Sequence, residues 1–329
     1  MKILVTGGLG FIGSNFILHV LKKYPNFQII NIDAQLPGSN PENLKGLNRN
    51  KNYQYIKGNI TNKKLIDKLV SRSDVVFNFA AESHVDRSIN DPMPFIDSNI
   101  FGVYTILEAI RKHKKKLIQI STDEVFGSLK SGSANEKYSF NPSSPYAASK
   151  ASAELLIQSY ITTYDCDAII TRCTNNYGPR QDPEKLIPRV ILFSLHNKKI
   201  PIYGTGKNIR DWIFVLDHCD AILKVFFRGK AGESYNISGL NELDNLKVVK
   251  MILKIMEKSQ NFIYFTKDRP GHDFRYSLDS SKISRKLRWK PSYNFEAGLE
   301  YTVKWYLANK NWWKNISSES LNPTPWKNR

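Results

Sequence analysis

Residues 2–13 read KILVTGGLGFIG, and this stretch decides the fold class. Lys2–Thr6 is a short apolar, β-branched run of the kind that forms a buried strand. Gly7, Gly10 and Gly13 follow in a G-x-x-G-x-x-G spacing and lead into an amphipathic helix predicted to reach about Lys22. Glycines in such a turn let backbone N–H groups approach a pyrophosphate at the helix N-terminus. A glycine loop alone is weak evidence, because strand-to-helix turns contain glycine for geometry alone.

The context of the loop strengthens this interpretation. A second predicted strand, Phe27–Ile32, ends in Asp33. An acidic residue at this point in a dinucleotide-binding unit takes the ribose hydroxyls of NAD and disfavours the extra phosphate of NADP. The alternative is that Asp33 only caps a turn. The sequence therefore predicts NAD as the cofactor.

The same alternation of strands and helices continues along the chain. It predicts an α/β fold with a Rossmann-type, doubly wound parallel sheet. Further strands are expected at Tyr53–Lys57, Val75–Phe79, Lys116–Ile120 and Ala168–Arg172, and helices at Lys63–Val70, Phe95–Arg111 and Tyr146–Tyr164.

The character of the sequence changes after residue 178, where proline, glycine and short strands become frequent. We expect an NAD-binding domain over 1–178, a smaller C-terminal α/β substrate lobe over 179–316 and a polar tail over 317–329. The strand near 212–215 is expected to return to the first domain.

The strongest chemical signal is a group of acid/base side chains. Thr122, Asp123 and Glu124 follow the strand Lys116–Ile120, and ligands of open parallel sheets bind outside the carboxyl ends of strands. Tyr146 and Lys150 are four residues apart on one helix and so share a face. The alternative for Thr122 is a helix cap, which we disfavour because the residues after Glu124 do not resemble a helix start.

The bulk composition narrows the classes of protein. The net charge of +18 could indicate nucleic-acid binding, but no basic stripe interleaved with aromatic residues is present, so we favour a solvated surface that attracts anionic metabolites. Three cysteines without a CxxC pair suggest a reducing compartment, with neither a disulfide framework nor a metal site. The first apolar run is too short for a signal peptide, and no run is long enough to span a bilayer. We therefore expect a soluble, cytoplasmic protein without membrane or nucleic-acid partners.

Six motifs together resemble the extended short-chain dehydrogenase/reductases and, within them, the dTDP-glucose 4,6-dehydratase family. They are AAESHVDRSI (80–89), STDEVFG (121–127), YAASK (146–150), NNYGP (175–179) with PEKLIP (183–188), RDW (210–212) and DRPGHD (268–273). The resemblance implies dehydration of dTDP-D-glucose to dTDP-4-keto-6-deoxy-D-glucose by internal hydride transfer through tightly bound NAD, in rhamnose-type deoxysugar nucleotide biosynthesis. It also implies a homodimer paired through helices such as Phe95–Arg111 and Tyr146–Tyr164.

The resemblance further assigns residues by motif. Proton transfer falls on Thr122, Asp123, Glu124, Tyr146 and Lys150. Contacts to NAD fall on Gly7, Gly10, Phe11, Ile12, Gly13, Asp33, Asn59, Ile60, Ala80, Ala81, Asn99, Tyr146, Lys150 and Asn176. Contacts to the sugar nucleotide fall on His84, Thr122, Asn175, Lys185, Leu186, Pro201, Tyr203, Arg210, Asn245, Asp268, Arg269 and His272. Asn59 departs from the family, which usually has Asp there.

A mechanism follows as a hypothesis. Lys150 and the positive nicotinamide should favour the phenolate of Tyr146, which takes the proton of the sugar 4-hydroxyl. Glu124 then removes the C5 proton, and Asp123, kept protonated beside it, protonates the leaving 6-hydroxyl. A simple epimerase has no use for two acids here.

Three alternatives stay open at this point. A UDP-glucose 4,6-dehydratase and a nucleotide-sugar 4-epimerase would share most of these motifs. A non-catalytic NAD-binding regulatory protein would need a broken catalytic set.

Overall fold

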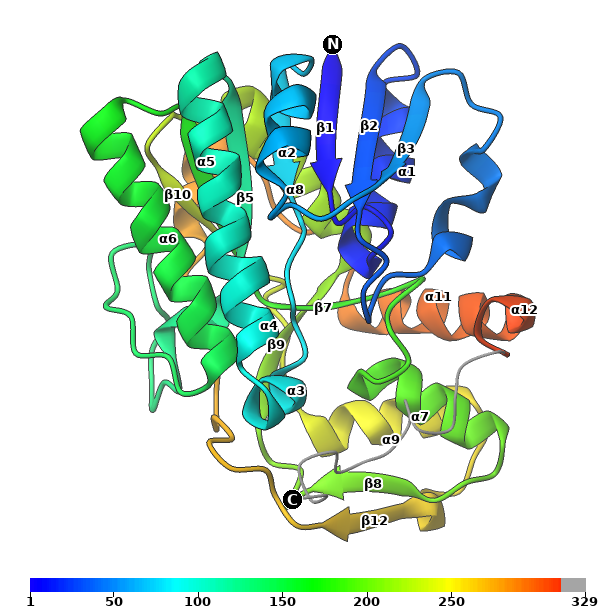
Figure 1. Ribbon diagram of the computed structural model, residues 1–329. Helices are drawn as coiled ribbons and strands as arrows, with labels where there is room; N and C mark the ends of the chain where they lie inside the picture. Colours follow the sequence, from blue (N-terminus) through cyan, green and yellow to red (C-terminus); the bar gives the residue numbers. More distant parts are fainter. Residues whose placement is uncertain (315–329) are drawn as a thin grey trace.

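A computed structural model describes residues 1–314, so the predicted tail at 317–329 lies outside the described residues. Its centre is a seven-stranded sheet in the order β10-β6-β5-β4-β1-β2-β3, with every neighbouring pair parallel (Figure 1). The strands are β1 (Lys2–Thr6), β2 (Gln28–Asp33), β3 (Tyr53–Lys57), β4 (Val75–Asn78), β5 (Lys116–Thr122), β6 (Ala168–Cys173) and β10 (Ser234–Ile237). The predicted Rossmann-type sheet is thus confirmed.

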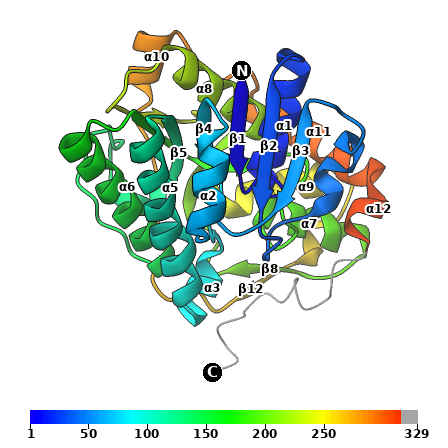
Figure 2. The same ribbon diagram turned by 45° about the horizontal axis from the view of Figure 1, so that its top comes forward.

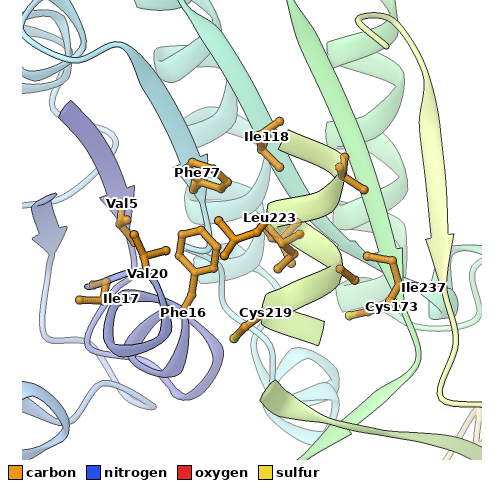
Figure 3. Close-up of a cluster of buried hydrophobic side chains, with 14 of the residues drawn as sticks. Val5, Phe16, Ile17, Val20, Phe77, Ile118, Cys173, Cys219, Leu223 and Ile237 are labelled. Carbon is orange, nitrogen blue, oxygen red and sulfur yellow. The ribbon is translucent and has the colours of Figure 1, made fainter. Parts of the chain in front are cut away.

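Helices cover both faces of this sheet. One face packs against α1 (Phe11–Lys23), α8 (Val215–Arg228) and α10 (Ser281–Leu287). The other packs against α2 (Lys63–Ser71), α5 (Gly102–His113) and α6 (Pro145–Tyr164), which lie together in Figure 2. Figure 3 shows Phe16 of α1 and Leu223 of α8 meeting Phe77 of β4 in the first of these cores. Burial from both sides explains why the central strands β1 and β4 are mostly apolar, whereas the edge strand β3 is polar and partly exposed.

The smaller lobe is built on two short sheets. Strands β8 (Ile200–Tyr203) and β12 (Ile263–Thr266) pair in parallel, and β11 (Glu242–Asp244), β9 (Ile209–Phe214) and β7 (Asn175–Tyr177) form the other sheet. The helices α7 (Leu186–Leu195), α9 (Asn245–Ile255), α11 (Phe295–Ala308) and α12 (Lys310–Trp313) complete it. In Figure 1 this lobe lies beyond the carboxyl ends of the main strands, where a ligand of the sheet would bind.

Short helical segments complete the chain. They are η1 (Pro41–Leu47), α3 (Val85–Asn90), α4 (Met93–Phe95), the π-helical η2 (Ile96–Phe101), η3 (Asp123–Phe126) and η4 (Gln260–Phe262). Among the helices of residues 1–314, none combines the length and apolar character needed to cross a bilayer.

Two sequence-based expectations are wrong. The strand over 212–215 does not return to the main sheet, because β9 is paired on both sides, by β7 and β11. The strand that returns is β10, after α8 has crossed the face of the sheet beside α1. In addition, a short 3-10 helix does follow β5, and the Thr122 hydroxyl accepts a hydrogen bond from the N–H of Glu124 at its start.

The placement of the predicted Tyr/Lys pair follows from how α6 begins. Ser144 caps the helix by accepting a hydrogen bond from the N–H of Ala147, and Pro145 occupies the first turn, where its missing N–H costs nothing. Tyr146 therefore lies in the first turn and Lys150 in the second, both on the buried side. This end of α6 packs against η3, which carries the two acids.

Candidate active site

A single large cavity collects most of the predicted residues at the carboxyl ends of the main strands. Those that line it are Gly7, Gly10, Phe11, Ile12, Gly13, Asp33, Asn59, Ile60, Ala80, Ala81, His84, Thr122, Asp123, Glu124, Tyr146, Lys150, Asn175, Asn176 and Lys185. They come from both the sheet domain and the first segment of the lobe. The structure thus brings the acid/base residues and the glycine loop into one space.

The glycine loop has room for nothing larger than glycine at two positions. Gly7 has a φ of +69°, and a Cβ there would lie 2.6 Å from the Cα of Ala80. A Cβ on Gly13 would lie 2.5 Å from the carbonyl oxygen of Gly7. Helix α1 begins at the cavity, and its N-cap, Gly10, offers no side-chain cap. Its first N–H groups can therefore hold an anion such as a pyrophosphate.

Asp33 is a buried carboxylate held in place by three donors. Its Oδ2 accepts a hydrogen bond from the N–H of Leu9 at 3.0 Å, and its Oδ1 accepts from the N–H of Gln35 and the hydroxyl of Ser39, both at 2.8 Å. The first of these bonds ties the end of β2 to the glycine loop. This arrangement suits an acidic residue that receives a ribose hydroxyl.

Asn99 differs from the expectation of a cofactor contact. It does not line the cavity, and its amide instead brackets Glu82, accepting from the N–H at 2.9 Å and donating to the carbonyl at 3.0 Å. A further bond runs from its Nδ2 to the hydroxyl of Ser149 at 2.8 Å. Asn99 therefore fixes the loop after β4 against α6, while its neighbour Ser98 lines the cavity.

Asp123 is the more deeply buried of the two acids. Its Oδ1 accepts a hydrogen bond from the Thr122 hydroxyl at 3.1 Å, whereas its Oδ2 has no partner within residues 1–314. Burial and the neighbouring charge of Glu124 raise the pKa of Asp123 well above its ordinary value. A carboxyl in this position holds a proton and can give it up to a ligand.

Glu124 has a different environment. Burial raises the pKa of Glu124 as well, but the positive charges of Arg269, Arg210 and Lys185 oppose that rise. Glu124 is therefore the acid of the pair that is ionised first, and it can act as a base while its neighbour stays protonated.

Lys150 and Tyr146 are both buried in α6. The Nζ of Lys150 donates a hydrogen bond to the carbonyl of Ile120 at 2.7 Å, and burial lowers the pKa of Lys150 to about 8. Burial and the charge of Glu124 raise the pKa of Tyr146 well above its ordinary value. The expectation that Lys150 and a positive nicotinamide together favour the phenolate stays a prediction, and the protein's own groups around Tyr146 favour the phenol.

Ion pairs connect the loop after β4 to the smaller lobe. Glu184 pairs with Arg87, and Asp86 pairs with Arg269 at 3.0 Å. The Nε2 of His84 also lies 3.1 Å from Glu184, but burial and the neighbouring cations lower the pKa of His84 well below its ordinary value, so this contact involves a neutral imidazole. These long-range pairs explain the charges of Asp86 and Arg87 in this loop. Glu184 lines the cavity but is not among the predicted site residues, although it lies within the PEKLIP motif.

The other predicted substrate residues lie in the lobe, outside the residues that line the cavity. They are Leu186 at the start of α7, Pro201 and Tyr203 on β8, Asn245 at the start of α9, Arg210 on β9, and Asp268, Arg269 and His272 on the loop after β12.

Two of these residues fasten that loop. Arg210 donates hydrogen bonds to the carbonyls of Asp273 and Phe274, and its guanidinium lies 4.2 Å from the ring centroid of Tyr276. The ring of His272 lies 2.6 Å from Asp268, and burial lowers the pKa of His272 to about 4.

Comparison with known proteins identifies the family of this chain. The protein-family model described as GDP-mannose 4,6 dehydratase matches residues 4–302. The dTDP-glucose 4,6-dehydratase of Shigella flexneri is 44% identical over 347 aligned positions, which cover 97% of this chain and 96% of that protein.

Solved structures give the same result. A dTDP-glucose 4,6-dehydratase from Bacillus anthracis in complex with NAD is 45% identical with a TM-score of 0.91, covering 96% of this chain and all of that one. The Streptomyces venezuelae dTDP-glucose 4,6-dehydratase with NAD and TYD bound is 40% identical with a TM-score of 0.94 over the same shares of the two chains. The chain therefore belongs to the dTDP-glucose 4,6-dehydratase family.

Proposed function

We propose that this chain removes water from dTDP-D-glucose to give dTDP-4-keto-6-deoxy-D-glucose, with NAD as a bound cofactor, in the synthesis of deoxysugar nucleotides. The observation that carries the proposal is the pair Asp123 and Glu124, whose environments separate their protonation states, next to Tyr146 and Lys150. Relatives support the same activity, because the Shigella flexneri protein and the two solved structures are all named dTDP-glucose 4,6-dehydratase.

NAD fits the residues that are present. The uncapped start of α1 and the close approach of Gly7 to Ala80 leave space and N–H donors for a pyrophosphate, and Asp33 stands where a ribose would lie. The chemistry that NAD supplies when bound is removal of a hydride from one sugar carbon and its return to another.

The protein's own residues then account for the protons. Tyr146 takes the proton of the sugar 4-hydroxyl, whose oxygen Thr122 also contacts. The 4-keto group acidifies the C5 proton, which Glu124 removes and later returns. Asp123 protonates the leaving 6-hydroxyl, so that one water is lost, and the proton gained by Tyr146 balances the one that Asp123 gives up.

A positive nicotinamide ring would affect the pKa of Tyr146. Because burial and Glu124 hold the Tyr146 phenol protonated, a cationic ring beside it would lower that pKa and favour proton transfer to Tyr146 in the loaded enzyme.

We propose further that residues 1–178 bind NAD and that the lobe from residue 179 onward binds the nucleotide diphosphate. The cationic side chains of Lys185, Arg210 and Arg269 lie near Glu124 and suit an anionic substrate. The three cysteines are free and buried, which fits a reducing compartment such as the cytoplasm.

We also propose a homodimer. Exposed apolar side chains occur on α4, η2 and α6, and include Met93, Ile96, Phe101, Leu155 and Tyr164. A face of this kind on paired helices is typical of an interface with a second copy.

The deciding experiment is incubation of the NAD-loaded protein with dTDP-glucose and, in parallel, UDP-glucose, followed by mass spectrometry. Loss of one water from dTDP-glucose is expected at the higher rate. An isomer of unchanged mass would instead identify an epimerase. Faster dehydration of UDP-glucose would identify UDP-glucose as the preferred substrate.

A further inference from the structure

The helix at the end of the described chain is connected to the glycine loop by two hydrogen bonds. The indole Nε1 of Trp312 donates to the Oδ1 of Asn43 at 2.7 Å. The Nδ2 of Asn43 in turn donates to the carbonyl of Leu9, inside the glycine loop, at 2.8 Å. Asn43 is buried, and both views place α12 at the edge of the molecule where the chain runs on from β2 (Figures 1 and 2).

Leu9 also forms hydrogen bonds, through its backbone, with the end of β2 and the residues that follow it. Its N–H donates to Asp33, and the N–H of Asn40 donates to its carbonyl. Residues 36–39, between Asp33 and Asn40, line the cavity. Trp312 therefore acts, through Asn43, on a loop and a segment that together form one border of the dinucleotide site.

The same group of aromatic residues reaches the opposite border. We call Trp305, Tyr306, Trp312 and Trp313 the C-terminal aromatic cluster, in which the ring of Trp312 lies 5.1 Å from that of Trp305 and 6.0 Å from that of Tyr306, measured between centroids. The Tyr306 hydroxyl donates to the carbonyl of Gln181, which lines the cavity. The Nε2 of Gln181 donates to the carbonyl of Asn176 at 2.8 Å.

The two borders also come close to each other. A Cβ on Gly38 would lie 3.9 Å from the Oδ2 of Asp182, so the segments 36–39 and 181–185 face each other across the cavity. The segment 36–39 would therefore border a dinucleotide whose pyrophosphate is held at the glycine loop.

We propose that Trp312 is a positioning residue for the cofactor, which slows release of the dinucleotide by holding Asn43 and, through it, the glycine loop. This inference rests on the proposed binding of NAD. It assigns a role to the C-terminal helix that the motif residues of the site do not include.

The test compares two tryptophans that differ in what their N–H groups hold. Trp312→Phe keeps an aromatic ring but removes the donor to Asn43. Trp313→Phe removes a donor that reaches only the carbonyl of Tyr306, within the same cluster. The protein is loaded with NAD, and release is followed by adding an enzyme that consumes free NAD. Release from Trp312→Phe should be about 2- to 10-fold faster than from the parent, the factor that one ordinary hydrogen bond represents, and release from Trp313→Phe should match the parent.

A second comparison separates this role from simple packing. Asn43→Ala should also speed release, and the double variant Trp312→Phe/Asn43→Ala should release NAD no faster than Asn43→Ala alone, because both changes break the same connection. The melting temperatures of the NAD-free Trp312→Phe and Trp313→Phe proteins should be equal. Equal release rates for the parent and Trp312→Phe would overturn the proposal, as would a lower melting temperature of Trp312→Phe that accounts for its faster release.

Failure of this inference and failure of the proposed function are distinguishable, since release is measured without any sugar. An NAD-loaded protein that leaves dTDP-glucose unchanged would contradict the dehydratase alone. A working dehydratase with the same release rate in both tryptophan variants would contradict the role of Trp312 alone.

Discussion

Asp123 combines burial with a carboxyl oxygen that has no hydrogen-bond partner within residues 1–314. A buried polar atom without a partner destabilises a fold by about 1–3 kcal/mol. Such costs persist at sites where the unsatisfied group serves a ligand. Asp123 is therefore the residue at which the stability of this protein and its proposed chemistry are in conflict.

This conflict predicts a pH-dependent stabilisation by Asp123→Asn. Because the pKa of Asp123 is raised by burial, its contribution to stability is complete below the ordinary value of 3.8 and is lost as pH rises through the raised value. The amide cannot ionise, so the variant should gain on the parent as pH rises, reaching roughly 1–3 kcal/mol at pH 8. Urea unfolding of both proteins at pH 5 and pH 8 measures the difference. A gap that does not widen between the two pH values would show that Asp123 is not protonated in the folded state.

Variants of the two acids should have different effects, because Glu124 is proposed to remove the C5 proton and Asp123 to protonate the leaving 6-hydroxyl. Glu124→Gln should lower the rate of water loss by about 10²–10⁴-fold, the range for loss of a general base or acid, and should stop exchange of the C5 proton with deuterated solvent. Asp123→Asn should lower the rate of water loss similarly but keep that exchange, because Glu124 is intact. Mass spectrometry of the sugar nucleotide in deuterium oxide gives both readouts. Exchange that continues in Glu124→Gln would assign the C5 proton to another residue.

The pH profile of turnover follows from the same two residues. Glu124 must be ionised, so the rate should fall at low pH, and its raised pKa moves that fall above the ordinary value of 4.5. Asp123 must be protonated, so the rate should also fall as pH rises through its raised pKa. A bell-shaped kcat/KM profile is expected, and in Asp123→Asn the residual activity should lose the alkaline fall that Asp123 causes. An unchanged alkaline limb in that variant would assign it to a different group.

At the scale of elements, a buried ion pair joins α6 to β6, and its guanidinium also contacts η3. Glu154 follows Tyr146 and Lys150 at the same four-residue spacing on α6, and Arg172 of β6 donates to both of its carboxylate oxygens, at 3.1 and 2.8 Å. The guanidinium also lies 5.0 Å from the ring centroid of Phe126 in η3. The pair therefore connects the helix with the Tyr/Lys residues to the turn with the acids.

Removing one partner of this ion pair should lower the free energy of unfolding more than replacing both partners by apolar residues. Arg172→Met leaves Glu154 as an unpaired buried charge and should lower the free energy of unfolding by about 3–5 kcal/mol. The double variant Arg172→Met/Glu154→Leu buries no charge, so it should be more stable than Arg172→Met alone. Urea unfolding of both variants and the parent tests the order. Additive losses would mean that the two side chains contribute separately.

The sequence predicts elements whose residues carry their own local signal. The strand β1 with its glycine loop, Asp33 at the end of β2, and the spacing of Tyr146 and Lys150 all depend on residues close together in the chain, and they lie where expected. The return of β10 rather than β9 to the main sheet could not be predicted, because both are short strands that mix polar and apolar residues and only their pairing distinguishes them. The contact of Trp312 with Asn43 joins distant parts of the chain by one hydrogen bond, for which no sequence pattern exists.

At the scale of the whole molecule, the largest unexplained feature is the outer side of the helical layer. Helices α5 and α6 lie side by side along the sheet in Figure 1, and α6 buries Ile157 against the core but exposes Leu155 and Tyr164 among polar residues on its outer side. In a single copy of the chain the inner side of α6 packs on the core, whereas its outer side is exposed to water. A second copy that packs the same helices against these would cover it by two-fold symmetry.

A charge placed on that outer face should separate the two copies. Leu155→Glu puts a carboxylate into each half of the proposed interface, where it has no partner and meets its own symmetry mate, so the dissociation constant of the dimer should rise at least about 100-fold. Phe265→Glu is the matched control, because Phe265 on β12 is 56% exposed and Leu155 is 55% exposed, yet β12 lies in the lobe away from α5 and α6 (Figure 1). Analytical ultracentrifugation should find monomers of Leu155→Glu at concentrations where the parent and Phe265→Glu are dimers. If Leu155→Glu stays dimeric, the interface lies elsewhere, and if Phe265→Glu alone dissociates, the lobe provides it.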